Sequence, residues 1–569
     1  MTRKLLSSVL HRRLHAGELR KHDQESIAVS LSSRFMLFVL LAIPTAAASA
    51  GHVPDSARTL AYIHRAWSTL TRSSANCASY RGPYVRGQQV LYLPKDLPMP
   101  QAVPALEKCG VEVRRLPMRI RRLGEFDPAT LEYQGYLYLP HPYVVPGGFF
   151  NEMFGWDSYF IELGLIADHR DALARDMVEN MLFEVAHYGG VLNANATDFL
   201  TRSQPPFLAE MIRALLADRG AFRDPRAAAV WLHRAYPLAV EYYSLWQRNA
   251  HRAGNTGLSR YFDYGGASPA VIRGAYFREV IRFVLAHPGE NDGYLIKAAQ
   301  RPSAAESARL AQQSCDPRAS QACADAWYGG YRLTAKFYRG DRAMRESGFD
   351  VTFRFGPFAG STTDYAPVGL NSLLYRYALD MRGFAQRLRL AADAKRWGQA
   401  AAARQQAIDR YLWNPALGLY TDYDFVTRKP SYYAFVTTFW PLWAGAASRL
   451  QAQAVRDNLP LFERVGGLQT STYASGAQWD APFGWAPTNW LAVSGLRSYG
   501  YDADARRIAA EFTATVDRGL ARDGTIREKY NMVTGGSEVK ITAGYTQNVI
   551  GFGWTNAVYL KLEQLLSRS

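Results

Sequence analysis

Apolar residues recur at three- and four-residue steps along most of the chain from about residue 155 onward. This spacing places apolar side chains on one face of a helix. Loops rich in proline, glycine and aromatic residues precede many of these segments, and no strict repeat period is visible. The pattern favours a large, mostly helical domain of paired helices. It predicts helices over 156–187, 206–219, 226–248, 366–393, 396–411, 434–449, 486–500, 502–519 and 552–566.

The region before residue 135 has a different, mixed pattern. A helix is predicted over 56–72, whereas 88–94 and 110–120 are typical of strands or extended segments. This region is therefore expected to form an extension that wraps on the helical domain.

Composition excludes several classes of function. The chain has 569 residues, of which 48% are hydrophobic and 20% charged, as expected for a globular protein with a large core. The net charge of +16 is spread as single arginines rather than gathered in a basic block, so no nucleic-acid partner is expected. No zinc-type spacing, phosphate-binding loop or calcium loop is present, so neither a metal nor a nucleotide cofactor is predicted.

An apolar run over 36–50 follows Arg34 and ends in Ala48-Ser49-Ala50. It is too short to span a bilayer, and its small-residue end is typical of a signal-peptide cleavage site near Ala50. The sequence thus predicts a periplasmic or secreted protein without a stable membrane partner. Alternatively, the segment stays as an anchor, or translation begins further downstream.

The four cysteines allow two short-range pairings. Cys315 and Cys323 flank a polar loop, while Cys77 and Cys109 both lie in the N-terminal region. An even number of cysteines in an exported chain favours disulfides, but spacing does not fix the connectivity.

The most informative segment reads Gly-Ala-Gln-Trp-Asp-Ala-Pro-Phe-Gly-Trp-Ala-Pro-Thr-Asn-Trp over 476–490. Its proline and glycine content argues against a regular helix or central strand. A rigid loop that exposes tryptophans beside a carboxylate suits a sugar, because indole rings stack on C–H faces and carboxylates accept from hydroxyls. Alternatively, the segment is a buried turn whose tryptophans fill the core.

A second segment, over 145–160, also carries a Gly/Pro entry and a Trp-Asp pair: Val-Pro-Gly-Gly-Phe-Phe-Asn-Glu-Met-Phe-Gly-Trp-Asp-Ser-Tyr-Phe. The two segments resemble the signature segments of the trehalases, glycoside hydrolase family 37. Similar stretches lie at 202–206, 346–354, 527–530 and 551–556, so the resemblance spans about residues 135–565.

The resemblance implies an all-α (α/α)6 barrel, a toroid of six helical hairpins. It also implies hydrolysis of trehalose to glucose with inversion, by general acid and base and without a cofactor. A small disaccharide is the expected partner, and the protein is expected to be a monomer. The chain is thereby divided into an N-terminal extension with signal peptide (1–50), a mixed extension packed on the barrel (51–135) and the catalytic barrel (136–569).

Glycoside hydrolysis needs one protonated carboxyl and one carboxylate. Asp350 matches the general acid of the family's Glu-Ser-Gly-x-Asp-x-x-x-Arg segment, and Glu528 in Glu-Lys-Tyr matches its base. By themselves these residues also suit a helix-capping turn and a solvated surface pair, respectively. The further residues that the resemblance assigns to the substrate are Phe150, Trp156, Asp157, Asn195, Arg202, Gln204, Arg354, Gln478, Trp479, Asp480 and Trp485.

The chain departs from the family in several polar residues. Phe149 stands where trehalases carry an arginine, and the family's Asn-Gly-Asn-Arg-x-Tyr-Tyr segment has become Asn-Ala-Asn-Ala-Thr-Asp-Phe over 193–199. The Arg-Pro-Glu-Ser of bacterial trehalases is missing near 268–271, and Gly544 occupies the place of a glutamate. Two alternatives therefore stay open: an inverting hydrolase of another α-glucoside, or a non-catalytic sugar-binding relative.

Overall fold

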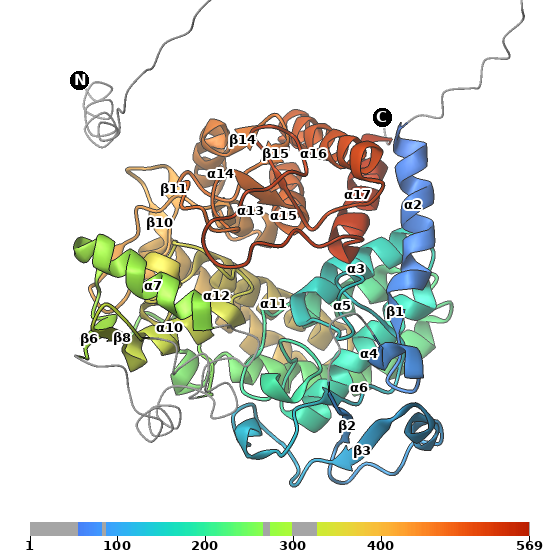
Figure 1. Ribbon diagram of the computed structural model, residues 1–569. Helices are drawn as coiled ribbons and strands as arrows, with labels where there is room; N and C mark the ends of the chain where they lie inside the picture. The colour runs from blue at the N-terminus through green and yellow to red at the C-terminus, as the bar shows by residue number, and fades with distance from the viewer. Residues whose placement is uncertain (1–54, 82–86, 266–273, 299–326, 568–569) are drawn as a thin grey trace, which may run out of the picture. The chain divides into compact units, whose positions relative to one another are not determined.

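The structure is a computed structural model that describes residues 55–81, 87–265, 274–298 and 327–567 (Figure 1). Six of its helices close into a ring, because α3 contacts α5, α5 contacts α11, and the contacts continue through α13, α15 and α17 back to α3. The inner helices are α3 (Gly155–Ala167), α5 (Leu208–Ala217), α11 (Val368–Arg387), α13 (Trp440–Ala444), α15 (Ala486–Ser498) and α17 (Gly553–Leu566).

A second set of helices alternates with these along the chain and packs outside them. For example, α12 packs on α11, α4 on α3 and α5, and α16 on α15 and α17. This arrangement of helical hairpins is the (α/α)6 barrel, which confirms the predicted fold. The alternating set consists of α2 (Asp55–Leu70), α4 (Asp171–Tyr188), α6 (Pro225–Leu245), α12 (Ala391–Tyr411), α14 (Arg449–Asp457) and α16 (Asp502–Asp523).

Burial explains which helices form the ring. Helix α3 is buried from Gly155 to Glu162 without interruption, as expected for a helix surrounded on all sides. In contrast, α14 buries only Ala452 and Val455, and a Ser448/Gln451 capping box fixes its exposed start.

The helix predictions are correct for most elements but miss two breaks. The predicted helix 156–187 is α3 and α4, separated by a turn in which His169 adopts a left-handed φ of 55°. The predicted helix 434–449 is divided into a 3-10 turn (Val436–Phe439), α13 and the start of α14. Apolar periodicity continues across both breaks, so the pattern alone could not locate them.

Helix α10 (Ala335–Glu346) was not predicted, and neither was α7 (Gly274–Ala286). The α10 sequence is highly charged, which normally indicates an exposed helix. Here Asp341, Arg342 and Arg345 are buried, and each forms an ion pair with a buried partner. Hydropathy cannot recognise a helix whose buried face is made of paired charges.

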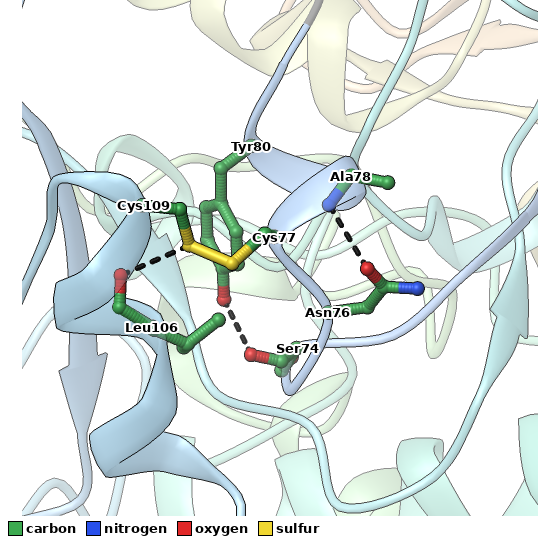
Figure 2. The surroundings of a disulfide bond; sticks show 7 residues. All are labelled: Ser74, Asn76, Cys77, Ala78, Tyr80, Leu106 and Cys109. Carbon is green, nitrogen blue, oxygen red and sulfur yellow. Dashed lines mark hydrogen bonds between the residues drawn. A yellow bond between two sulfur atoms is a disulfide. The ribbon is translucent and has the colours of Figure 1, made fainter.

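The N-terminal region is built on a small parallel sheet, in which β2 (Gln89–Leu93) pairs with β3 (Val111–Arg115) and β4 (Tyr136–Leu137). Cys77 and Cys109 form a disulfide with a Cα–Cα distance of 6.0 Å, and beside it the Tyr80 hydroxyl donates to the Ser74 carbonyl (Figure 2). Cys315 and Cys323 lie outside the described residues, as does the predicted signal peptide.

The remaining strands are short and connect loops. They are β1 (Thr71–Arg72) with β5 (Tyr143–Val144), β10 (Trp413–Asn414) with β11 (Leu419–Tyr420), β14 (Glu463–Arg464) with β15 (Gly467–Leu468), β16 (Phe483–Trp485) with β17 (Lys529–Asn531), β12 (Tyr423–Asp424) with β9 (Tyr365–Ala366) and β13 (Lys429–Pro430), and β8 (Tyr331–Leu333) with β6 (Leu295–Lys297) and β7 (Trp327–Tyr328). Within the described part of the chain, no helix is long and apolar enough to cross a membrane.

Candidate active site

The predicted acid, Asp350, lies in the loop between α10 and α11. The Gln478 side-chain amide donates to the Asp350 carbonyl, and the Trp479 N–H donates to the Val351 carbonyl at 3.2 Å. The 476–490 segment is therefore joined to the loop that carries Asp350. The Asp350 side chain stays 30% exposed, so its carboxyl is accessible.

The surroundings of Asp350 shift its carboxyl toward the protonated form. Its pKa is raised to about 6, chiefly by desolvation and also by the nearby charge of Glu528, against the opposing effects of Arg345 and Arg202. A carboxyl with such a pKa keeps a proton to a higher pH than an ordinary aspartate does. Asp350 therefore has the property that a general acid requires.

Arg345 is a site residue that the sequence reasoning missed. Its Nη1 lies 3.8 Å from Asp350 Oδ2 and donates to the Tyr545 hydroxyl at 2.5 Å, while Nε and Nη2 donate to Asp341 at 3.1 and 2.9 Å. An arginine in the last turn of a helix usually complements the helix dipole, so its sequence position did not distinguish it. Its place five residues before the predicted acid was the available signal.

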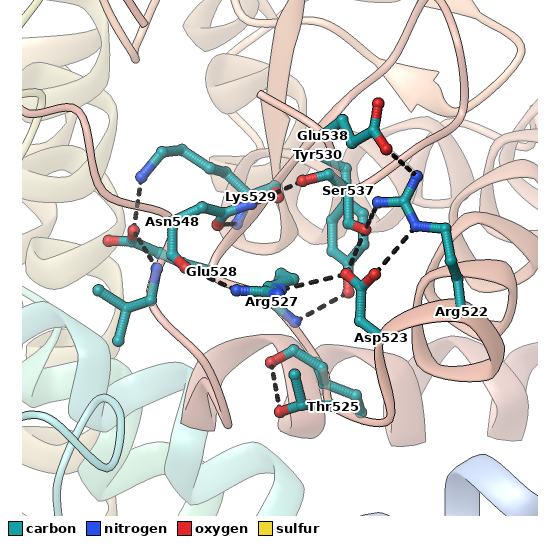
Figure 3. A network of polar contacts seen from close by, with 12 residues as sticks. Arg522, Asp523, Thr525, Arg527, Glu528, Lys529, Tyr530, Ser537, Glu538 and Asn548 are labelled. Atoms are coloured by element: carbon teal, nitrogen blue, oxygen red, sulfur yellow. Dashed lines mark hydrogen bonds and ion pairs between the residues drawn. The ribbon is translucent and has the colours of Figure 1, made fainter. Parts of the chain in front are cut away.

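The predicted base, Glu528, directly precedes β17, which pairs antiparallel with β16 so that Lys529 faces Trp485. Lys529 Nζ donates to Glu528 Oε2 at 2.5 Å, and the Val549 N–H donates to the same oxygen at 3.5 Å (Figure 3). Lys529 is fully buried, and the Glu528 side chain is 15% exposed. Glu528 is thus paired directly with a buried cation through one of its carboxylate oxygens.

Asp157 is a third carboxyl in the same electrostatic environment. It is buried in the first turn of α3, and burial raises its pKa well above the ordinary value. The charges of Glu528 and Asp350 raise that pKa further, so the three carboxyls influence one another. Its pKa is thus shifted toward the neutral form, in which a carboxyl both donates and accepts hydrogen bonds.

The predicted tryptophans form one buried cluster. Trp479 and Trp485 stack with ring centroids 3.8 Å apart and planes at 6°, and Trp156 contacts Trp479 and, edge-on, Trp554. Each of these rings is at most 3% exposed. The cluster therefore matches the alternative in which the signature tryptophans fill the core. It forms a rigid support under the loops that carry Asp350 and Glu528.

Phe150 is placed differently from the tryptophans. It is half-buried and packs edge-to-face on Phe149, on Phe154 and on Phe552, with centroids 5.1, 5.2 and 6.4 Å apart. Phe149 is also half-buried.

Three residues predicted to contact the substrate have buried side chains that bind other groups of the protein in this structure, and their contact with a substrate stays a prediction. Asp480 is fully buried and accepts from Thr352 Oγ1 and the Phe353 N–H, both at 2.8 Å. The Asn195 side chain is fully buried, accepts from the Met153 N–H at 2.7 Å and donates to the Leu137 carbonyl at 3.0 Å.

Arg354 is the third of them. Its guanidinium binds Asp422 through two hydrogen bonds of 2.6 and 2.5 Å and lies 4.3 Å from the Phe435 ring centroid. Asp422 also accepts from the Val368 N–H at the start of α11, at 2.9 Å. The buried Arg354–Asp422 pair therefore fixes the acid loop to an inner helix.

The Arg202–Gln204 segment lies beside the acid and α3. Gln204 Oε1 accepts from the Trp156 N–H at 2.9 Å, which satisfies a free donor at the start of α3. Arg202 is buried, lies 3.5 Å from Asp263 Oδ2, and lowers the pKa of Asp350.

Among the described residues, no group of three or more His, Cys, Asp or Glu side chains is arranged to hold a metal ion.

The helices form an (α/α)6 barrel, and Asp157, Asp350 and Glu528 lie close enough for their charges to interact. The trehalase family model matches residues 102–269 and 296–567. The chain belongs to the trehalase family, as the sequence resemblance predicts.

Similar proteins include the cytosolic neutral trehalases of Kluyveromyces lactis, 34% identical over 505 residues, and of Saccharomyces cerevisiae, 34% identical over 465. These matches cover 83% and 76% of this chain, and the chain spans about 60% of the relatives' length, 61% and 58% respectively. The solved structure of neutral trehalase Nth1 from S. cerevisiae is similar, with a TM-score of 0.72 and 30% identity, covering 90% of this chain and 94% of that one.

These relatives overturn one prediction. Several fungal relatives are named as cytosolic proteins, which contradicts the predicted signal peptide and the predicted periplasmic or secreted location. The prediction was wrong because a short apolar run that ends in small residues is a compositional signal with low specificity.

Proposed function

We propose that this protein hydrolyses trehalose to two molecules of glucose with inversion, with Asp350 as general acid and Glu528 as general base. The observation that carries this proposal is the contrast between the two carboxyls. Asp350 is shifted toward its protonated form and has its nearest cation at 3.8 Å, whereas Glu528 is paired directly with a buried lysine at 2.5 Å. Membership of the trehalase family, with relatives named as trehalases, supports the substrate.

The reaction follows from these assignments. Glu528 takes a proton from a water molecule as the water oxygen forms its bond to the anomeric carbon. The glycosidic C–O bond breaks, and its electron pair leaves on the oxygen, which takes the proton of Asp350. Asp350 ends as a carboxylate and Glu528 as a carboxylic acid, and exchange with solvent restores both.

Neighbouring groups are proposed to bind the sugar hydroxyls. Asp157 in its neutral form can both accept from and donate to a hydroxyl. Arg345 and Arg202 each lower the pKa of Asp350, so both lie within electrostatic reach of the acid. A guanidinium carries several N–H donors, so the N–H groups that Asp341, Tyr545 and Asp263 do not use are proposed to donate to sugar hydroxyls.

Phe149 supports a second candidate, an inverting hydrolase of another α-glucoside. A charge-assisted hydrogen bond is worth about 1.5–3 kcal/mol, and this chain has exchanged the corresponding arginine for a ring that packs on Phe150. The loss weakens the case for trehalose specificity but leaves the acid and the base in place.

A panel of α-linked glucose disaccharides separates the two candidates. We expect the purified protein to cleave trehalose with a higher kcat/KM than any of the other linkages. The Phe149→Arg variant should change kcat/KM for trehalose without changing the order of preference. Faster cleavage of another linkage by the wild type, together with a rise in trehalose cleavage by Phe149→Arg, would establish the second candidate instead.

A further inference from the structure

Lys529 is a fully buried cation whose Nζ contacts a carboxylate, a backbone carbonyl and a tryptophan ring. Its Nζ donates to Glu528 Oε2 at 2.5 Å and to the Gln547 carbonyl at 2.7 Å. The same nitrogen lies 4.8 Å from the centroid of the Trp485 ring, within the range of a cation–π interaction. Burying an ammonium group is costly unless it is paired and hydrogen-bonded, so this position is built to hold a charge.

The Lys529 side chain is held by rigid elements. Its backbone belongs to β17, which pairs with β16 so that Lys529 lies opposite Trp485. Trp485 in turn stacks on Trp479 and donates from Nε1 to the Gln478 carbonyl at 3.0 Å. The ammonium group therefore has a fixed position relative to the loop that binds the Asp350 carbonyl.

The two donors to the Glu528 carboxylate converge on one oxygen. Both Lys529 Nζ and the Val549 N–H contact Oε2, and Figure 3 shows the other carboxylate oxygen pointing away from them. The carboxylate is thus held by one oxygen, which leaves the other free to accept a hydrogen bond from water. The Glu528 backbone is fixed as well, because its N–H donates to the Val549 carbonyl at 2.9 Å.

We propose that Lys529 is a positioning residue for the general base: it fixes Glu528 through Oε2 and so directs the remaining oxygen to the attacking water. This inference rests on the proposed function. The carboxyls of Asp157 and Asp350 interact with the charge of Glu528, whereas the nearby Arg527 guanidinium donates to Asp523 and the Asn548 carbonyl. Lys529 is therefore the cation that contacts the Glu528 carboxylate directly.

The test replaces Lys529 by methionine, which keeps an unbranched side chain of nearly the same length and removes its charge, and by arginine, which keeps the charge. We expect Lys529→Met to lower kcat by about 10–100-fold with little change in KM, a part of the about 10²–10⁴-fold that a well-placed general base usually contributes. The acidic limb of its pH–rate profile should move to higher pH, because the Glu528 carboxylate then lacks its adjacent cation. Lys529→Arg should restore part of kcat and return the limb toward the wild-type position.

Lys561→Met is the matched control. Lys561 lies on α17 with its Nζ 5.8 Å from the Trp490 centroid, so it shares the lysine–tryptophan contact, and its Nζ donates to the Gln564 side chain. This variant should keep the wild-type kcat and pH profile. A Lys529→Met enzyme with an unmoved acidic limb, or a loss equal to that of Lys561→Met, would overturn the proposal. If Glu528→Gln also kept full activity, the assignment of the base would fail as well.

Discussion

The Asp350→Asn variant is expected to lose at least about a thousandfold in kcat on trehalose while keeping its fold. General acids contribute about 10²–10⁴-fold, and the leaving glucose oxygen is a poor leaving group without a proton. The variant should recover most of its activity on α-glucosyl fluoride, because fluoride departs without protonation. Steady-state rates on both substrates, with circular dichroism as a check of folding, measure this effect.

The same residue sets the expected pH dependence of the wild type. Since burial raises the pKa of Asp350 to about 6, the protonated form is lost as the pH rises through that value, and kcat/KM for trehalose should fall on the basic side. The profile on α-glucosyl fluoride should lack this basic limb. An Asp350→Asn enzyme that cleaves trehalose at near the wild-type rate would remove Asp350 from the mechanism.

The Glu528→Gln variant should lose a similar factor, but with a different pattern of rescue. The amide keeps the shape of the side chain and cannot accept the proton of water, so both trehalose and α-glucosyl fluoride should be cleaved slowly. In Glu528→Ala, added azide should restore turnover, because an anion attacks the anomeric carbon without needing a base.

The product of that rescue distinguishes the two carboxyls. Attack by azide from the side of Glu528 yields β-glucosyl azide, which can be identified by NMR. Rescue of Asp350→Asn by azide on trehalose is not expected, because the leaving oxygen would still lack its proton. Formation of α-glucosyl azide in Glu528→Ala would show that the nucleophile enters from the other face, and would contradict the assignment of the base.

Much of the barrel could be predicted from the sequence, because its helices bury continuous apolar faces. The pattern located α5, α6, α11, α15, α16 and α17 to within a few residues at most ends. It failed where burial depends on paired charges, as in α10, where Asp341 and Arg345 face the interior as an ion pair. The charges interrupt the apolar stripe that Phe337 and Met344 would otherwise form, so the pattern is hard to detect.

For the site, the motifs identified the right neighbourhood but not the direction of each side chain. Asp480 and Arg354 belong to the family-like segments, yet in this structure the side chains of both form hydrogen bonds that fix the acid loop. Arg345 and Lys529 were passed over because charged residues beside a motif usually face solvent. Only the tertiary contacts show that these two cations lie beside the two catalytic candidates.

The anomeric form of the released glucose tests the central claim most directly. With enzyme in large enough amount to outrun mutarotation, proton NMR of trehalose cleavage should first show α- and β-glucose in equal amounts. The attacked sugar is inverted to the β-anomer, while the departing sugar keeps its α-configuration. Release of α-glucose alone, or no release of glucose from trehalose, would contradict the proposed inverting hydrolysis by Asp350 and Glu528.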